Sequence, residues 1–155
     1  MNKIIARLTV CAAALGISIA TPAFAQQIGA SPTFGRVSLS AGFMPDPHRV
    51  DIVAGGTIDV AQTRGGNCVG KIANAPDFTL NYDAGSAALV IKATSSQDTT
   101  LIVNSANGAW YCNDDSNGVN PGIRISNPPS GLYEIWVGTY EDEPVSATIL
   151  ISEVY

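Results

Sequence analysis

The chain has 155 residues, of which 14% are charged, and its formal net charge is −5 at pH 7. Nucleic-acid binding depends on Lys and Arg side chains that neutralise phosphates, so this acidic balance argues against it. The length is enough for one domain with a substantial hydrophobic core.

The first 25 residues have the pattern of an export signal. Lys3 and Arg7 precede an almost unbroken apolar run over residues 8–19, and Ala23 and Ala25 place small residues where a signal peptidase cuts. The run is about half the roughly 20 residues that a membrane-spanning helix needs, so an uncleaved anchor is the weaker interpretation. The sequence predicts Sec-type export, cleavage after Ala25, a periplasmic or secreted location and no membrane span in the mature chain.

Cleavage would remove Cys11 and leave Cys68 and Cys112 as the remaining cysteines. In an oxidising compartment, a disulfide between them is the expected outcome. The alternative is a thiol metal site or a reactive cysteine, which would need further ligands nearby. The single histidine, His48, is 20 residues from Cys68, so we favour the disulfide.

Short β-rich segments separated by turn residues follow one another from residue 36 to the end, and no stretch has the apolar spacing of an amphipathic helix over three turns. This pattern predicts an all-β antiparallel sandwich or a barrel of about eight to nine strands, as a single domain over residues 26–155. Asn107-Gly108 predicts a tight hairpin, and residues 26–34 are expected to form a loose N-terminal arm. The expected strands cover residues 36–40, 48–53, 57–60, 78–82, 88–94, 99–104, 109–113, 123–126, 132–140 and 145–154.

Four segments of the C-terminal half form a recognisable pattern, namely residues 98–101 (DTTL), 110–115 (WYCNDD), 118–125 and 129–140 (PSGLYEIWVGTY). In these segments, and more loosely over residues 78–93, the chain resembles the bacterial pre-peptidase C-terminal domain family. The resemblance implies a jelly-roll-like sandwich over residues 78–155 and a stand-alone secreted member of a family that usually accompanies secreted proteases. Some of its members carry calcium, and fold similarity alone transfers no activity.

A loop rich in Asp and Asn is the first candidate site. Asn113, Asp114, Asp115 and Asn117, with Asn120 and backbone carbonyls, offer the hard oxygen ligands that Ca²⁺ prefers, although the spacing is not that of an EF-hand. The alternative is that these side chains bond their own backbone in tight turns. Calcium is therefore the one cofactor the sequence suggests.

Catalysis has little support in the sequence. His48 lies close to Asp46, with Ser38 and Ser40 shortly before, which leaves a small serine-peptidase-like hydrolase as the alternative function. No Gly-x-Ser-x-Gly elbow is present. We favour a strand-start role for His48 and no enzyme activity.

Aromatic residues gather in the C-terminal half. If Tyr133, Ile135 and Val137 face the core, Trp136 and Tyr140 on the other face are expected to be partly exposed. Together with Trp110 they could stack on sugar rings or anchor a peptide, but for Trp136 itself we favour the alternative, in which it covers a sheet edge or packs under a loop. The expected function is an exported, non-enzymatic binding or structural module that recognises a polysaccharide or an envelope protein.

Overall fold

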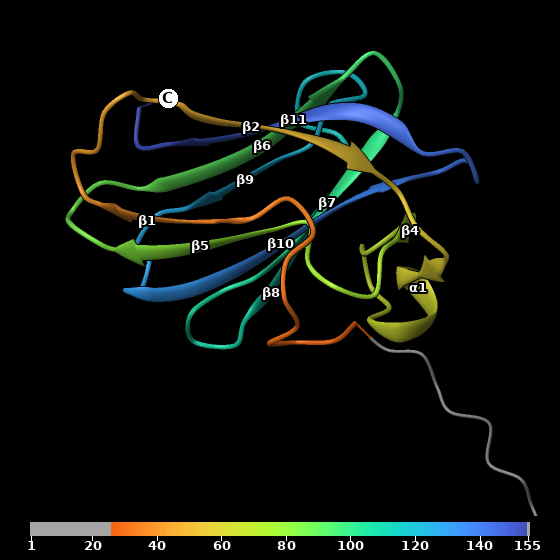
Figure 1. The fold of residues 1–155 in the computed structure, drawn as a ribbon, viewed down its shortest axis with the longest axis horizontal. Coiled ribbons are helices and arrows are strands. Elements are labelled where there is room, and N and C mark those ends of the chain that lie inside the picture. Colours follow the sequence, from red (N-terminus) through yellow and green to blue (C-terminus); the bar gives the residue numbers. More distant parts are fainter. Residues whose placement is uncertain (1–25, 155) are drawn as a thin grey trace, which may run out of the picture.

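The computed structural model describes residues 26–154, and the expected export signal over residues 1–25 lies outside this range. Two sheets pack face to face, which confirms the all-β sandwich (Figure 1). No helix within the described range is long and apolar enough to cross a membrane.

The smaller sheet has four strands, all paired antiparallel in the order β2-β11-β6-β9. Side chains alternate along each strand between the inner and the outer face, and most outward ones are at least partly exposed, although Val90 of the third strand is 4% exposed. The strands are β2 (His48–Ala54), β11 (Val145–Ser152), β6 (Leu89–Ser95) and β9 (Gly122–Ile125).

The larger sheet is built around β10 (Gly131–Thr139). One edge of β10 pairs with β5 (Phe78–Asp83), and its other edge pairs with β7 (Thr99–Asn104). The sheet continues from β7 to β8 (Trp110–Asn113), and from β5 to β1 (Arg36–Ser40). The β1–β5 pair is parallel, which corrects the expectation of a purely antiparallel sandwich. After β1 the chain passes through β2 of the other sheet and then through residues 58–72, whose two short strands also belong to the larger sheet, before it reaches β5. No tight hairpin therefore joins β1 to β5, and a long connection of this kind allows the two strands to pair in parallel.

Two short strands and one helical turn replace the strand expected over residues 57–60. β3 (Ile58–Asp59) pairs with the unexpected β4 (Lys71–Ile72), and α1 (Val60–Thr63) follows β3 directly. The side chain of Asp59 accepts a hydrogen bond from the Ala61 N–H at 3.0 Å, and this capping contact turns the chain into the helix. With these short strands included, the described residues form eleven strands.

The main core lies between the two sheets and is built from alternate positions of their strands. Tyr133 is fully buried there, and its hydroxyl donates to the Pro129 carbonyl at 2.6 Å, so its polar end is satisfied. Burial of each large side chain contributes roughly 1.5–3 kcal/mol. Fully buried members include Leu80, Leu89, Ile91, Leu101, Val103, Tyr133, Ile135, Val137, Ile149 and Ile151.

A second, smaller core lies on the outer face of the larger sheet. Residues 56–72, here called the cap, contribute Ile58, Val60 and Ile72, which pack against Ile102 and Trp136 of the sheet. A Cβ on Gly56 would lie 2.1 Å from the Ile72 carbonyl group, so only glycine allows the cap to close so tightly.

The N-terminal segment is ordered, and the expectation of a loose arm over residues 26–34 is wrong. Backbone N–H groups of Gln27 and Thr33 donate to the carbonyls of Asn74 and Pro76, both at 2.9 Å. The N–H of Gly29 donates to Oε1 of Glu134 at 2.7 Å, and Glu134 is 3% exposed. Hydrogen bonds to the loop before β5 and to β10 hold this segment in place. Such bonds leave no hydrophobic periodicity in the sequence, so nothing in the sequence indicated them.

Candidate binding surface

The predicted aromatic surface is not formed, because Trp136 is fully buried. The expectation of a partly exposed Trp136 is therefore wrong, and this side chain presents no surface to a ligand. The cap covers it, as in the alternative that placed it under a loop. Alternation correctly put Trp136 on the outer face of β10 but could not show that a distant segment covers that face.

Trp110 belongs to the same structural cluster. Its ring centroid lies 5.5 Å from that of Trp136, and the guanidinium carbon of Arg64 lies 3.6 Å from the Trp110 centroid. The Arg64 Nε also donates to Oε1 of Gln26 at 3.1 Å, and the Gln26 Nε2 donates to the Thr63 hydroxyl at 2.9 Å. A cation and a buried indole thus already engage this ring, which leaves it poorly suited to stack on a sugar.

Tyr140 is 43% exposed but lies away from the two tryptophans. It follows the Thr139–Thr99 end of the β10–β7 ladder, whereas Trp110 pairs with Asn104 at the other end of β7. The Tyr140 hydroxyl donates to Oδ2 of Asp114 at 2.7 Å, and this bond, followed by partial burial, raises the pKa of Tyr140 to about 12. The three aromatic residues do not form one platform.

Cys68 and Cys112 form the expected disulfide, with their Cα atoms 5.1 Å apart. The bond ties the cap to β8 and flanks the small outer core. Both sulfurs are consumed in this bond, so the thiol metal site is excluded, and the disulfide agrees with an oxidising compartment.

The Asp- and Asn-rich loop uses several of its polar groups in hydrogen bonds to backbone groups, both at the loop itself and at the end of β6. Oδ1 of Asn113 accepts from the Gly122 N–H at 2.8 Å, the Asn117 N–H donates to the Asn120 carbonyl at 3.1 Å, and Oδ1 of Asn120 accepts from the Ser95 N–H at 2.8 Å. Within residues 26–154, no three His, Cys, Asp or Glu side chains are arranged to hold a metal ion. The turn interpretation therefore accounts for these amides, and calcium stays a prediction.

Sequence reasoning missed one acidic neighbour of this loop. Partial burial, followed by the charges of Asp115 and Asp114, raises the pKa of Asp98. Asp98 belongs to the turn between β6 and β7, more than a dozen residues earlier in the chain. Only the pairing of β7 with β8 brings this turn to the loop.

His48 begins β2, and its ring centroid lies 6.3 Å from that of Phe78. Oδ2 of Asp46 accepts a hydrogen bond from the Glu153 N–H at 3.0 Å. Ser38 and Ser40 lie on β1 in the other sheet. The contact of Asp46 is thus with the backbone just after β11, which gives this carboxylate a structural role.

The outer face of the four-stranded sheet carries a group of cations that the sequence interpretation did not identify. Arg49 and Lys92 both pair with Leu150, so the three residues form one row across the sheet. Lys92 also pairs with Gly122, and Arg124 is two residues further along β9. Residues 26–154 contain six Lys and Arg side chains, and three of them share this face.

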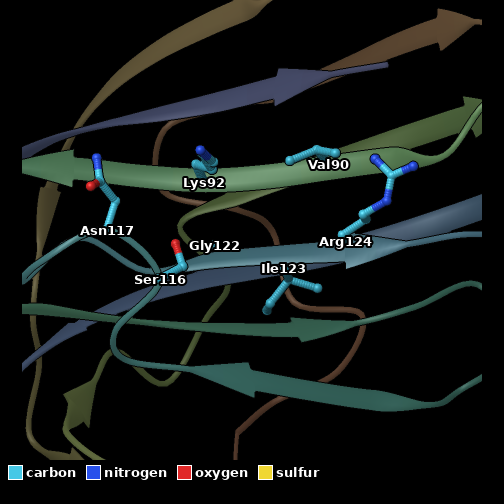
Figure 2. A pocket seen from close by; sticks show the side chains of 7 residues that line it. All are labelled: Val90, Lys92, Ser116, Asn117, Gly122, Ile123 and Arg124. Carbon is cyan, nitrogen blue, oxygen red and sulfur yellow. The ribbon is translucent and has the colours of Figure 1, made fainter. Parts of the chain in front are cut away.

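Two of these cations, Lys92 and Arg124, line a shallow hollow of ≈ 400 Å³. Figure 2 shows the side chains of Lys92, Val90 and Arg124 on the same side of β6 and β9, with Ile123 on the opposite side. A Cβ on Gly122 would lie 2.7 Å from the Ser116 Oγ and 3.2 Å from the Lys92 Cγ. The absence of a side chain at Gly122 thus allows the preceding loop to close over one end of the hollow. Its lining residues are Val90, Lys92, Ser116, Asn117, Gly122, Ile123 and Arg124.

Among known proteins, no protein-family model matches this chain, and no curated protein matches it. A solved structure, the pre-peptidase C-terminal domain of collagenase from Bacillus anthracis, is similar to it with 10% sequence identity and a TM-score of 0.45. The alignment covers 76% of this chain and 94% of that domain. A likeness of this size identifies no ligand and no activity, so the function has to be inferred from this chain's own residues.

Proposed function

We propose that the protein is an exported, non-enzymatic binding module and that its contact surface is the outer face of the four-stranded sheet. One observation carries this proposal: Arg49, Lys92 and Arg124 gather on one sheet face in a chain whose net charge is −5. A carboxylate on that face, Asp51, accepts a hydrogen bond from the Thr148 hydroxyl at 2.8 Å. A concentration of one charge sign on an acidic protein favours a ligand of the opposite sign.

Export is supported by two independent features. The first 25 residues have the pattern of a cleavable signal, and the Cys68–Cys112 disulfide is of the kind that persists outside the cytoplasm. The proposal predicts that the purified native protein begins at Gln26, which N-terminal sequencing would show.

The experiment is a chemical-shift map of the isotope-labelled protein during titration with solubilised envelope polymers. Amides of β2, β6 and β9 should shift first, because their outward side chains form the proposed surface. Shifts confined to the cap would contradict the proposal, and so would the absence of any shift. A His48→Ala variant that loses a measurable hydrolase activity would instead favour the enzyme interpretation.

A further inference from the structure

We infer that the ligand of this face is an anionic glycan, a polysaccharide that carries carboxylate or phosphate groups along its length. This inference rests on the proposed function, since it names the ligand class of the same surface. It starts from how the cations are spaced on the sheet. Neighbouring strands lie about 4.8 Å apart, and Arg49 and Lys92 are separated by one strand, β11. Their backbones are therefore about 10 Å apart.

Arg124 extends the row toward the edge of the sheet. It pairs with Val90, two residues from Lys92 on the same face of β6. Such diagonal neighbours on adjacent strands lie about 7–8 Å apart, within reach of long side chains. Within residues 26–154, no ion pair joins Arg49 or Arg124 to a carboxylate. Each guanidinium group can therefore donate two parallel hydrogen bonds to an external anion.

The rest of the face suits a polar, hydroxyl-rich polymer. Ser116 and Asn117 line the hollow beside the cations, and threonines at positions 94 and 148 continue the face beyond them. Among residues 26–154, the large apolar side chain that this face exposes most is Val53, at 49%. Protein interfaces are usually anchored by buried Trp and Tyr as well as Arg side chains, and this face has two arginines but no aromatic anchor within the described range. A protein partner is accordingly the weaker candidate.

The charge balance also separates a glycan from nucleic acid. A duplex carries one negative charge per about 1.7 Å of its axis, which would bring many phosphates close to an acidic protein with only three cations on this face. A glycan with one anionic group per sugar or per repeat presents fewer charges over the same length. Its widely spaced charges match separated cations better than a dense row of phosphates does.

The test is a calorimetric titration of the full protein with four polymers: a polyuronate, a phosphodiester-linked glycan, a neutral glucan and single-stranded DNA. The first two distinguish carboxylate from phosphate as the recognised anion. The variants are Arg49→Gln and Arg124→Gln, and Arg36→Gln is the matched control, since Arg36 is an exposed cation of β1 in the other sheet. A glutamine keeps polarity and length but removes the charge.

We expect one of the two anionic glycans to bind, with an affinity that falls as salt increases. Each of the two variants should weaken binding about 2- to 5-fold, and the double variant about tenfold, as for separate exposed charge contacts. Arg36→Gln should leave the affinity unchanged. Equal binding of the neutral glucan would overturn the anionic inference while the proposed surface stands, whereas equal binding of the DNA would replace the glycan by a general polyanion. If no polymer binds and no amide of β2, β6 or β9 shifts, the proposed function itself is wrong.

Discussion

The outer faces of the two sheets differ in what lies on them. On the larger sheet, Ile102 and Trp136 point outward and are fully buried, because the cap covers them and a disulfide ties the cap to β8. On the four-stranded sheet, the corresponding positions of the central strands are Lys92, Leu150 and Thr148, which are partly exposed. An apolar outer face needs a cover, whereas a charged one is stable in water without a cover.

This difference assigns separate roles to the two faces. The covered face holds two tryptophans, the disulfide and the N-terminal segment, so changes there should reduce stability. The bare face holds three cations and a shallow hollow, so changes there should affect binding and leave the fold intact. The predictions below test this division, from the largest expected effect to the smallest.

Trp136→Ala should have the largest effect. It would remove a fully buried indole from the small outer core, which should lower the free energy of unfolding by about 3–5 kcal/mol. The matched control on the other sheet is Leu150→Ala, which shortens a half-buried side chain between Arg49 and Lys92 and should cost about 1 kcal/mol. Denaturant unfolding measures both values, and equal losses would contradict the distinction between a covered and a bare face.

Removing the disulfide should come next. The Cys68→Ser/Cys112→Ser variant opens a loop with a sequence separation of 44, which corresponds to about 4 kcal/mol in the chain-entropy account and usually to somewhat less in practice. The loss should appear as a lower melting temperature of the variant, and of the parent protein after reduction. Amide shifts of β6 and β9 on titration with the bound polymer should be unchanged. Loss of those shifts with the fold intact would mean that the two faces are not independent.

Asp77 makes the stability of the larger sheet depend on pH. It is 2% exposed, and its Oδ2 accepts from the Val137 N–H at 2.7 Å just before β5 begins at Phe78. Burial raises the pKa of Asp77 to about 7, and the hydrogen bond from Val137 opposes this only in part. The folded state therefore holds the proton more tightly than the unfolded chain, so this group's contribution is present at about pH 4 and is lost as the pH rises toward 7.

Asp77→Asn tests this dependence, because the amide oxygen still accepts from Val137 while the charge is gone. Relative to the variant, the parent protein should lose on the order of 4 kcal/mol between pH 4 and pH 8. The comparison cancels the contributions of the other carboxylates, which both proteins share. Parallel stability profiles for parent and variant would show that Asp77 is not the responsible group.

The sequence predicted most strands because alternation and turn residues are local signals. The hairpin at Asn107-Gly108 is confirmed between β7 and β8, although only Gly108 has a positive φ, of 80°. Asn107 contributes through its side chain instead, and its Oδ1 accepts from the Ser105 hydroxyl at 2.6 Å and from the Ala109 N–H at 3.1 Å. The local Asn-Gly motif was therefore sufficient to predict the hairpin, although Asn107 acts through its side chain and not through a positive φ.

The surfaces could not be predicted in the same way, because they depend on contacts between distant segments. Alternation placed Trp136 on the outer face, but the cap that buries it comes from residues 56–72. The cationic face was missed for the same reason, since Arg49, Lys92 and Arg124 become neighbours only through the register of β2, β11, β6 and β9. The charges were visible in the sequence, whereas the strand order that gathers them was not.

The smallest expected effect concerns calcium at the loop that joins the two sheets. This loop runs from β8 to β9, and Asp98, Asp114 and Asp115 lie close enough there for the latter two to raise the pKa of Asp98. A bound cation would relieve this repulsion and stiffen the connection between the covered and the bare face. At a concentration ten times its dissociation constant, calcium should stabilise the protein by about 1.4 kcal/mol, which corresponds to a rise of roughly 3–6 °C in the melting temperature.

The double variant Asp114→Asn with Asp115→Asn should abolish this rise in melting temperature. The matched control is Glu141→Gln with Glu143→Gln, which removes two carboxylates from an exposed acidic turn. A parent protein whose melting temperature is the same with and without millimolar calcium would leave turn formation as the whole role of this loop.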